Sequence, residues 1–98
     1  RYADPACADL RAALSAKLAV AADRIVVGNG SEEMIAAVSR AVLTPGSEVL
    51  TVVPSFGLHE IEPLAMGARV RKIAMTPDLE FDLPAIADAL AAGPKLFF

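Results

Sequence analysis

The segment Glu-Val-Leu-Thr-Val-Val-Pro-Ser-Phe-Gly, residues 48–57, decides the fold. Its first six residues are mainly apolar and β-branched, which is typical of a strand that is buried on both faces. Pro54 and Gly57 then interrupt the run, so the sequence predicts a loop at the carboxyl end of this strand. A strand of this kind requires buried neighbours, and the flanking sequence supplies candidates for them.

Helix and strand patterns alternate on both sides of this strand. Helices are predicted from Asp4 or a few residues later to about Val20, between the turn at 28–31 and Thr44, from about Leu58 to Met66, and from Leu83 to Ala92. Further strands are predicted at 25–27, at 69–74 nearer the sheet edge, and from Lys95 onward. This order indicates crossover connections and a mostly parallel sheet covered on both faces, so the predicted fold class is α/β.

Composition and charge limit the classes of function. The 98 residues are 55% hydrophobic and 21% charged, which is typical of one globular domain at most. The formal net charge is −3 and the basic residues are scattered, so no nucleic-acid surface is indicated. No apolar run is long enough to span a membrane, and the first residues do not resemble a signal peptide. The single cysteine, Cys7, fits a reducing compartment, so a cytoplasmic location is expected.

The two ends of the chain lead to a separate expectation. The chain starts without methionine, and Lys95 to Phe98 begin an apolar strand that has no following turn. We therefore expect residues 1–98 to be one partial domain that is truncated at both ends.

The turn from Gly28 to Ser31 lies between a predicted strand and a predicted helix. Glycine lets the backbone turn sharply and approach a ligand closely, and the free amides of a helix's first turn attract anions. A phosphate site is therefore one interpretation, with Ser31 adding a hydroxyl group. A glycine turn with a simple Asn or Ser cap explains the same residues, and both interpretations stay open here. Glu32 and Glu33 would repel a phosphate, so their side chains are expected to face outward or to form salt bridges with a neighbouring element.

Two more specific nucleotide motifs are excluded by the residues present. The dinucleotide-binding fingerprint requires a third glycine where Glu33 stands, and an acidic residue at the end of the next strand, where Val53 stands. The triphosphate-binding loop requires Gly-Lys followed by Ser or Thr, and the sequence has no such segment.

Phe56 lies in the loop at the carboxyl end of a predicted strand, where open α/β sheets bind ligands. Its ring can stack on a planar ligand, and a phenylalanine folded back into the core fits the same position. His59 is the only histidine and has no metal-ligand partners at suitable spacing. A metal site and a serine–histidine–aspartate triad are therefore not predicted.

Six segments spread along the chain carry a resemblance to a known family. They are Arg-Tyr-x-Asp-Pro at 1–5, Leu-Arg-x-Ala-Leu at 10–14, Asp-Arg-Ile-Val-Val-Gly-Asn-Gly-Ser-Glu-Glu at 23–33, Arg-Ala-x-Leu-x-Pro-Gly-x-Glu-Val-Leu at 40–50, Pro-Ser-Phe-Gly-Leu at 54–58 and Thr-Pro-Asp-Leu-x-Phe-Asp-Leu at 76–83. Together they resemble histidinol-phosphate aminotransferases, within the class I and II aminotransferases of fold type I. The resemblance covers essentially the whole chain, and it implies part of the large domain that binds pyridoxal 5′-phosphate.

The resemblance implies roles for five residues. Gly30, Ser31 and Glu32 match the turn whose backbone and side chains hold the cofactor phosphate. Phe56 matches the aromatic residue that stacks on the pyridine ring. Tyr2 matches a tyrosine that reaches the cofactor phosphate of a partner subunit, so a homodimer with shared active sites is implied.

The chain also departs from the family pattern. Ala3 stands where proline is usual, and His59 stands where an aromatic residue is common, which would alter the wall near the substrate. Residues 1–98 contain no Asn-Pro-x-Asn-Pro-Thr-Gly segment, and no residue matches the family's pyridine-binding aspartate, Schiff-base lysine or substrate-binding arginine. Because the chemistry needs a lysine amine at the cofactor aldehyde, these 98 residues alone are expected to be inactive, and no catalytic residue is assigned.

The subfamily likeness implies an activity for the full-length parent. That activity is the interconversion of histidinol phosphate and 2-oxoglutarate with imidazole-acetol phosphate and glutamate, in histidine biosynthesis. Aromatic aminotransferases and threonine-phosphate decarboxylases share these segments and are alternatives. An alternative of a different class is a non-catalytic phosphate-binding α/β module. The resemblance further implies that residues 25–27 pair with a late strand, so their edge would be unpaired in this segment alone.

Overall fold

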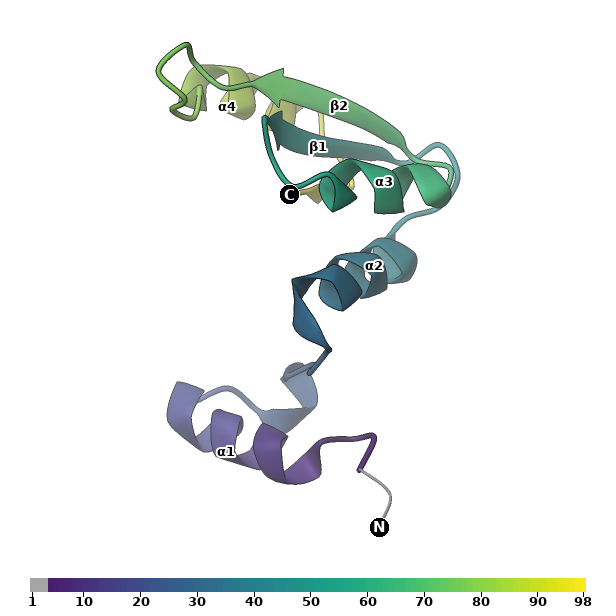
Figure 1. The fold of residues 1–98 in the computed structure, drawn as a ribbon, viewed down its shortest axis with the longest axis vertical. Coiled ribbons are helices and arrows are strands. Elements are labelled where there is room, and N and C mark those ends of the chain that lie inside the picture. The colour runs from purple at the N-terminus through teal and green to yellow at the C-terminus, as the bar shows by residue number, and fades with distance from the viewer. Residues whose placement is uncertain (1–3) are drawn as a thin grey trace.

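The computed structural model describes residues 4–98, which form two parts joined by an extended segment (Figure 1). The first part contains α1 (Ala8–Leu18) and the 3-10 turn η1 (Ala22–Arg24). The second part contains a parallel sheet with α2 (Gly30–Val42), α3 (Leu58–Ala65) and α4 (Leu83–Ala91). Its strands are β1 (Glu48–Val53), β2 (Arg69–Ala74) and β3 (Leu96–Phe97). The predicted α/β class with a parallel sheet is confirmed.

The strand order is β2-β1-β3, so β1 is the central strand and is parallel to both neighbours. In the register, Glu48 pairs with Arg69, and Val49 pairs with both Val70 and Leu96. The four middle residues of β1 are buried, whereas β2 buries only one of its six residues. The sequence therefore predicted correctly that 48–53 is a buried strand and that 69–74 lies at the edge.

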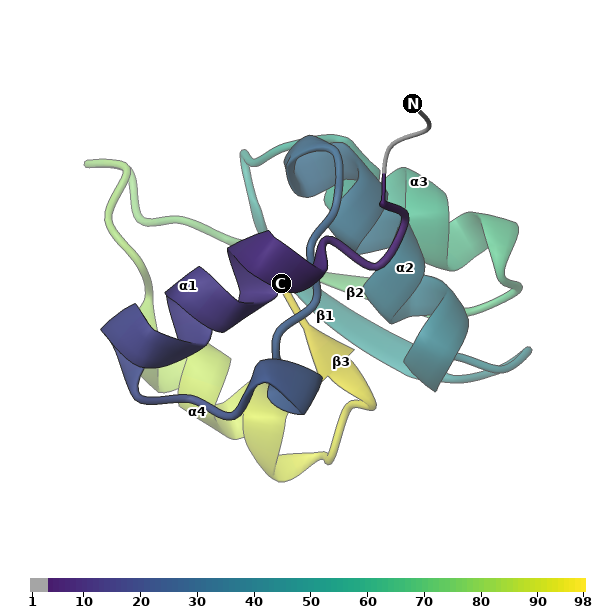
Figure 2. The same cartoon turned by 90° about the horizontal axis from the view of Figure 1, so that it is seen from below.

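Helices cover both faces of the sheet (Figures 1 and 2). On one face, α4 packs against β1 and β2 in a cluster of Leu50, Val52, Ile73, Ile86 and Ala89. On the other face, α3 contacts β1 and β2, and α2 packs against α3. Successive strand residues point to opposite faces, so Val49 belongs to the second face, where it packs with Leu43 and Ala68.

Residues 25–27 do not form the buried strand that the sequence predicted. Ile25 has extended backbone angles, φ −108° and ψ 120°, but no strand within residues 4–98 pairs with this segment. Val26 is 75% exposed. The prediction is wrong for these residues because a strand is defined by hydrogen-bonded neighbours, and none is present in the described part of the chain.

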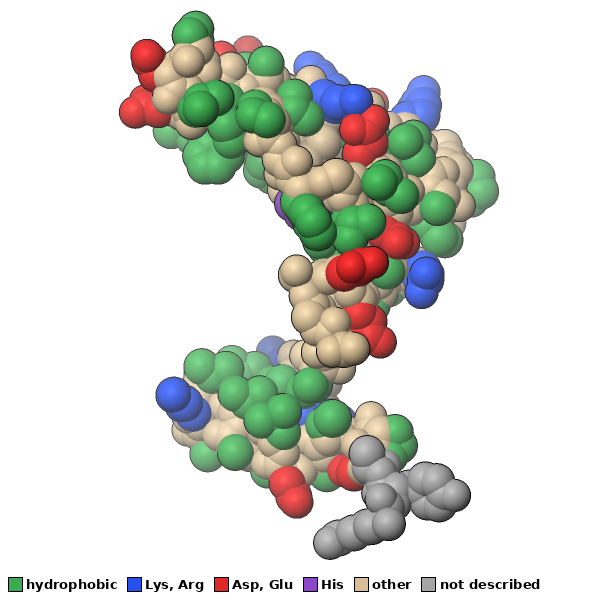
Figure 3. Space-filling model, in the orientation of Figure 1, with side chains coloured by type: hydrophobic (Ala, Val, Ile, Leu, Met, Phe, Trp, Pro, Cys, Tyr) green, Lys and Arg blue, Asp and Glu red, His purple; other side chains and the backbone are tan. Residues whose placement is uncertain are grey.

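The first part of the chain stands away from the sheet, as the space-filling view shows (Figure 3). The radius of gyration is 16.5 Å. A compact domain of this length has a radius of gyration of about 13 Å. No residue of α1 is buried, and Leu10 and Leu18 are about half exposed. The apolar side chains of α1 therefore have no full covering within residues 4–98.

The start of α1 lies at Ala8, a few residues after Asp4. The Asp4 carboxylate caps the intervening turn, since its Oδ2 accepts a hydrogen bond from the Ala8 N–H at 2.8 Å and its Oδ1 accepts one from the Ala6 N–H at 2.9 Å. These two bonds, that from Ala8 first, lower the pKa of the Asp4 carboxyl because they favour its charged form. The contribution of this cap to stability is thus present above the ordinary carboxyl pKa and is lost as the pH falls through the lowered one.

The turn after α3 leads the chain directly into β2. Gly67 has φ +73°, its N–H donates to the Leu64 carbonyl at 2.9 Å, and the Ala68 N–H donates to the Pro63 carbonyl at 3.1 Å. This pair of bonds is the Schellman motif, which favours glycine at the left-handed position. The prediction that Gly67 terminates this helix is confirmed.

Gly67→Ala is expected to lower the free energy of unfolding by about 1–2 kcal/mol, because an L-residue is strained in the left-handed region. Strain rather than crowding is the cause, since an added Cβ would lie 3.4 Å from the Pro45 Cβ, which is an ordinary contact. Urea-induced unfolding measures the change. Gly57→Ala is the matched control, because Gly57 has φ −57° and an added Cβ would meet only Ile61, at 3.9 Å. An equal loss in both variants would contradict the explanation.

Candidate functional site

The first turn of α2 has the backbone geometry of the predicted phosphate site. Gly30 has φ +82°, and a Cβ added there would meet no atom within 4 Å. The Asn29 side chain makes no capping hydrogen bond. Within residues 4–98, no group accepts a hydrogen bond from the amides of Gly30, Ser31 or Glu32. These amides therefore point outward at the positive end of the helix dipole, which suits an anion.

Two carboxylates flank this turn, and their placement limits what they can contribute. Glu33 accepts a hydrogen bond from the Asn29 backbone N–H. Both Glu32 and Glu33 are exposed, as expected, and neither forms an ion pair with a residue in the described range. They line a hollow of about 420 Å³ between α2 and α3, beside the Arg40 and Glu62 side chains, whose charged atoms lie 3.9 Å apart. A carboxylate repels a phosphate, so Glu32 fits an anion site through its backbone amide.

The first turn of α2 and the loop that carries Phe56 lie on the same side of the sheet. In Figure 1, α2 and α3 run opposite to β1 and β2, so their first turns lie on the side toward which the strands point. The loop that carries Phe56 also lies on that side, because it follows the last residue of β1. This is the carboxyl side, where open parallel sheets bind ligands.

Phe56 is 52% exposed, so it does not fold back into the core within the described part of the chain. Its ring lies 5.9 Å from the His59 ring, with an angle of 88° between the two planes. The His59 ring in turn stacks on the Phe98 ring, at 5.0 Å and 4°. The Ser55 Oγ and the His59 Nδ1 are hydrogen-bonded at 3.1 Å. A Phe56 ring held in this way leaves more than half of its surface open to a planar ligand.

The resemblance placed His59 near the substrate, but the sequence did not indicate that the His59 and Phe98 rings form a group with Phe56. Ser55 lies three residues before α3 and His59 lies in its first turn, and this short separation is a local signal that could have indicated their hydrogen bond. No local signal exists for Phe98, because it reaches His59 only through the pairing of β3 with β1.

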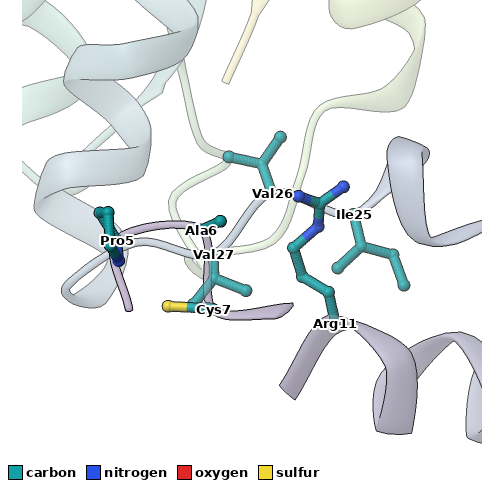
Figure 4. Close-up of a pocket in the computed structure, with 7 residues that line it drawn as sticks. All are labelled: Pro5, Ala6, Cys7, Arg11, Ile25, Val26 and Val27. Carbon is teal, nitrogen blue, oxygen red and sulfur yellow. The ribbon is translucent and has the colours of Figure 1, made fainter. Parts of the chain in front are cut away.

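A second hollow, of about 240 Å³, lies between the start of α1 and the extended segment 25–27 (Figure 4). Among residues 4–98, Arg11 is the only charged lining residue, and both its Nε and Nη2 donate to the Ala22 carbonyl, at 2.9 and 2.5 Å. The guanidinium thereby fixes η1 against α1. The other lining residues in the described range are Pro5, Ala6, Cys7 and the apolar residues 25–27. These residues form a structural anchor, and they include no set of catalytic groups.

Tyr2 lies outside the described residues, so its role stays a prediction. Within residues 4–98, no group of three or more His, Cys, Asp or Glu side chains could hold a metal ion. No helix in the described range is long and apolar enough to cross a membrane.

The sequence of this chain is similar to that of known aminotransferases. Residues 1–98 match the family described as aminotransferase class I and II. The chain is 43% identical over 95 residues to histidinol-phosphate aminotransferase 1 of Mesorhizobium japonicum, covering 97% of this chain and 26% of that protein. It is 42% identical over 95 residues to histidinol-phosphate aminotransferase 2 of Caulobacter vibrioides, covering 97% of this chain and 25% of that protein. The chain thus spans about a quarter of the length of these relatives.

A solved structure is similar over almost the whole chain. It is the histidinol-phosphate aminotransferase from Sinorhizobium meliloti in complex with pyridoxal 5′-phosphate, with a TM-score of 0.84 and 26% sequence identity. The match covers 99% of this chain and 26% of that one.

Proposed function

Because this chain belongs to the aminotransferase class I and II family, we propose that it forms part of the cofactor-binding domain of a pyridoxal-5′-phosphate-dependent aminotransferase. The observation that carries the proposal is the first turn of α2, with Gly30 at positive φ and three outward amides. A structurally similar aminotransferase binds the same cofactor, which supports the proposal.

The residues present fit this cofactor in two places. The amides of Gly30, Ser31 and Glu32, with the exposed Ser31 hydroxyl, would hold the phosphate at the head of α2. The half-exposed ring of Phe56 would stack on the pyridine ring. When bound, the cofactor supplies an electron-withdrawing ring that stabilises negative charge on the substrate carbon during amino transfer. The residues of this chain bind and orient, and none of them is assigned to proton transfer.

The names of the two relatives reported above indicate the proposed substrates. We propose that the protein interconverts histidinol phosphate and 2-oxoglutarate with imidazole-acetol phosphate and glutamate, supported by identities of 43% and 42% to two histidinol-phosphate aminotransferases. Aromatic amino acids and threonine phosphate are the alternative substrate classes. We further propose a cytoplasmic homodimer in which Tyr2 reaches the cofactor phosphate of the partner subunit.

The first test of this proposal is the coding sequence downstream of Phe98. We expect it to continue into an Asn-Pro-rich segment and, later, a lysine site of the type Ser-x-x-Lys. A stop codon directly after Phe98 would contradict the enzyme proposal and favour a non-catalytic phosphate-binding module. The substrate proposal is tested separately, by comparing kcat/KM for histidinol phosphate and for phenylalanine with 2-oxoglutarate as acceptor. A higher value for phenylalanine would contradict it.

A further inference from the structure

The rings of Phe98, His59 and Phe56 form a series from the sheet to the surface. Phe98 follows β3, and its N–H donates to the Leu50 carbonyl at 3.0 Å, so its backbone is fixed to the central strand. Its partly buried side chain packs against the core cluster that contains Val49. The Phe98 ring is therefore a fixed support for any ring that stacks on it.

Two contacts hold the His59 ring: it stacks on the Phe98 ring, and it forms a hydrogen bond with the Ser55 hydroxyl group. Its ring is nearly parallel to that of Phe98, with an interplanar angle of 4° and a centroid distance of 5.0 Å. The bond of 3.1 Å between its Nδ1 and the Ser55 Oγ fixes rotation of the imidazole about its own axis. Nδ1 can donate or accept in this bond, so the contact is available to either neutral tautomer. Two independent contacts thus define the orientation of His59.

Phe56 is the exposed end of this series of rings. It lies in the loop between β1 and α3 and is 52% exposed. Among residues 4–98, its one aromatic contact is the edge-to-face arrangement with His59, at 5.9 Å and 88°. An edge-to-face pair favours one relative orientation of two rings over the others. The orientation of the exposed ring therefore depends on His59.

We propose that His59 is a positioning residue, which holds the Phe56 ring in the orientation needed to stack on the planar ring of the bound ligand. The inference rests on the proposed function, because the ligand ring is that of pyridoxal 5′-phosphate. His59 acts through Phe56 and has no assigned contact with the cofactor. Ser55 and Phe98 support it, the first through its hydroxyl group and the second through its ring face.

The test uses the holoenzyme as its gene encodes it, with the variants Phe56→Ala, His59→Ala, the double variant, and His59→Phe. Two properties are measured: the dissociation constant of pyridoxal 5′-phosphate and the visible-region circular dichroism of the bound cofactor, which reports the orientation of its surroundings. His59→Ala is expected to weaken binding about three- to tenfold, which is the range of one aromatic pair. It is also expected to reduce the circular dichroism signal. His59→Phe loses the bond to Ser55 but keeps a ring that can stack on Phe98 and meet Phe56, so it is expected to bring both properties to within about twofold of the wild-type values.

The double variant separates positioning from direct contact. If His59 acts through Phe56, its loss has no further effect once Phe56 is alanine, so the double variant binds the cofactor as Phe56→Ala does. Independent, additive effects of the two substitutions would overturn the inference. Unchanged affinity and circular dichroism in His59→Ala would also overturn it.

A measurement without cofactor distinguishes failure of this inference from failure of the proposed function. The χ1 rotamer populations of Phe56, from three-bond NMR couplings, are compared between the wild-type apoprotein and His59→Ala. Populations that change show that His59 orients Phe56, even if the wild-type protein binds no pyridoxal 5′-phosphate, in which case only the proposed function fails. Populations that do not change, in a protein that binds the cofactor, overturn the positioning role alone.

Discussion

Ser31→Asp is expected to raise the dissociation constant of pyridoxal 5′-phosphate at least about tenfold while it stabilises α2 itself. The new carboxylate would lie in the first turn of the helix, where an anion typically gains about 0.3–1 kcal/mol. The same charge would repel the phosphate. Two like charges 4 Å apart near a protein surface repel by about 4 kcal/mol, and even a third of that is a tenfold change in affinity.

The opposite signs of the two effects distinguish a phosphate site from a simple helix cap. Cofactor titration measures the affinity, and thermal unfolding of the apoprotein measures the stability. Ser31→Asn is the matched control, because asparagine has the shape of aspartate without its charge. Stabilisation in Ser31→Asp with no loss of cofactor affinity would indicate that the turn is only a helix start.

Leu50→Ala is expected to lower the free energy of unfolding by about 2–5 kcal/mol, which is the range for a leucine deleted from a packed core. Leu50 has no exposed surface and lies in the central strand, in contact with both the neighbouring strand and α4 through the cluster that contains Ile73 and Ile86. The helix and the sheet would therefore lose a shared contact and retain a cavity. Urea-induced unfolding followed by far-ultraviolet circular dichroism measures the loss.

The matched control for the core prediction is Leu83→Ala. Leu83 is 68% exposed at the first position of α4, so the change is expected to stay within about 0.5 kcal/mol. A loss in Leu50→Ala no larger than that in Leu83→Ala would show that β1 is not the centre of the core.

The sequence predicted β1 and β2 with their observed bounds because their signals are local. The run 48–53 is apolar, mostly β-branched and bounded by Gly46 and Pro54. The run 69–74 alternates charged and apolar residues after Gly67, and the observed edge strand buries only Ile73. Local composition therefore carried both the type of element and its depth in the sheet.

The segment 25–27 shows where local composition is insufficient. Ile-Val-Val has strong β-propensity, yet the segment is extended and unpaired within the described residues. Propensity describes how well side chains suit a pleated, half-buried surface, and it does not supply the neighbouring strand. The resemblance to a family, which implied a late pairing partner, was the better guide at this position.

The same difference between local and long-range signals applies to the candidate site. The turn at Gly30 was predictable, because the Gly-Asn-Gly-Ser pattern and the following helix are contiguous in the sequence. The support of Phe56 by His59 and Phe98 was not, because it depends on the pairing of β1 with β3, in which the partners Val49 and Leu96 are 96 − 49 = 47 residues apart. A contact of this sequence separation becomes visible only once the sheet is assembled.

The most direct test of the phosphate site is the ratio of the dissociation constants of pyridoxal and pyridoxal 5′-phosphate, measured for the wild-type protein and for Ser31→Asp. The two ligands share the ring that Phe56 would stack on, so the ratio isolates the contribution of the phosphate. We expect the wild-type protein to prefer the phosphorylated ligand by at least about a hundredfold, from several charge-assisted hydrogen bonds at the head of α2. We expect Ser31→Asp to reduce that preference at least about tenfold. A ratio near one in the wild-type protein, or a preference that Ser31→Asp leaves unchanged, would contradict the assignment of Gly30, Ser31 and Glu32 to the cofactor phosphate.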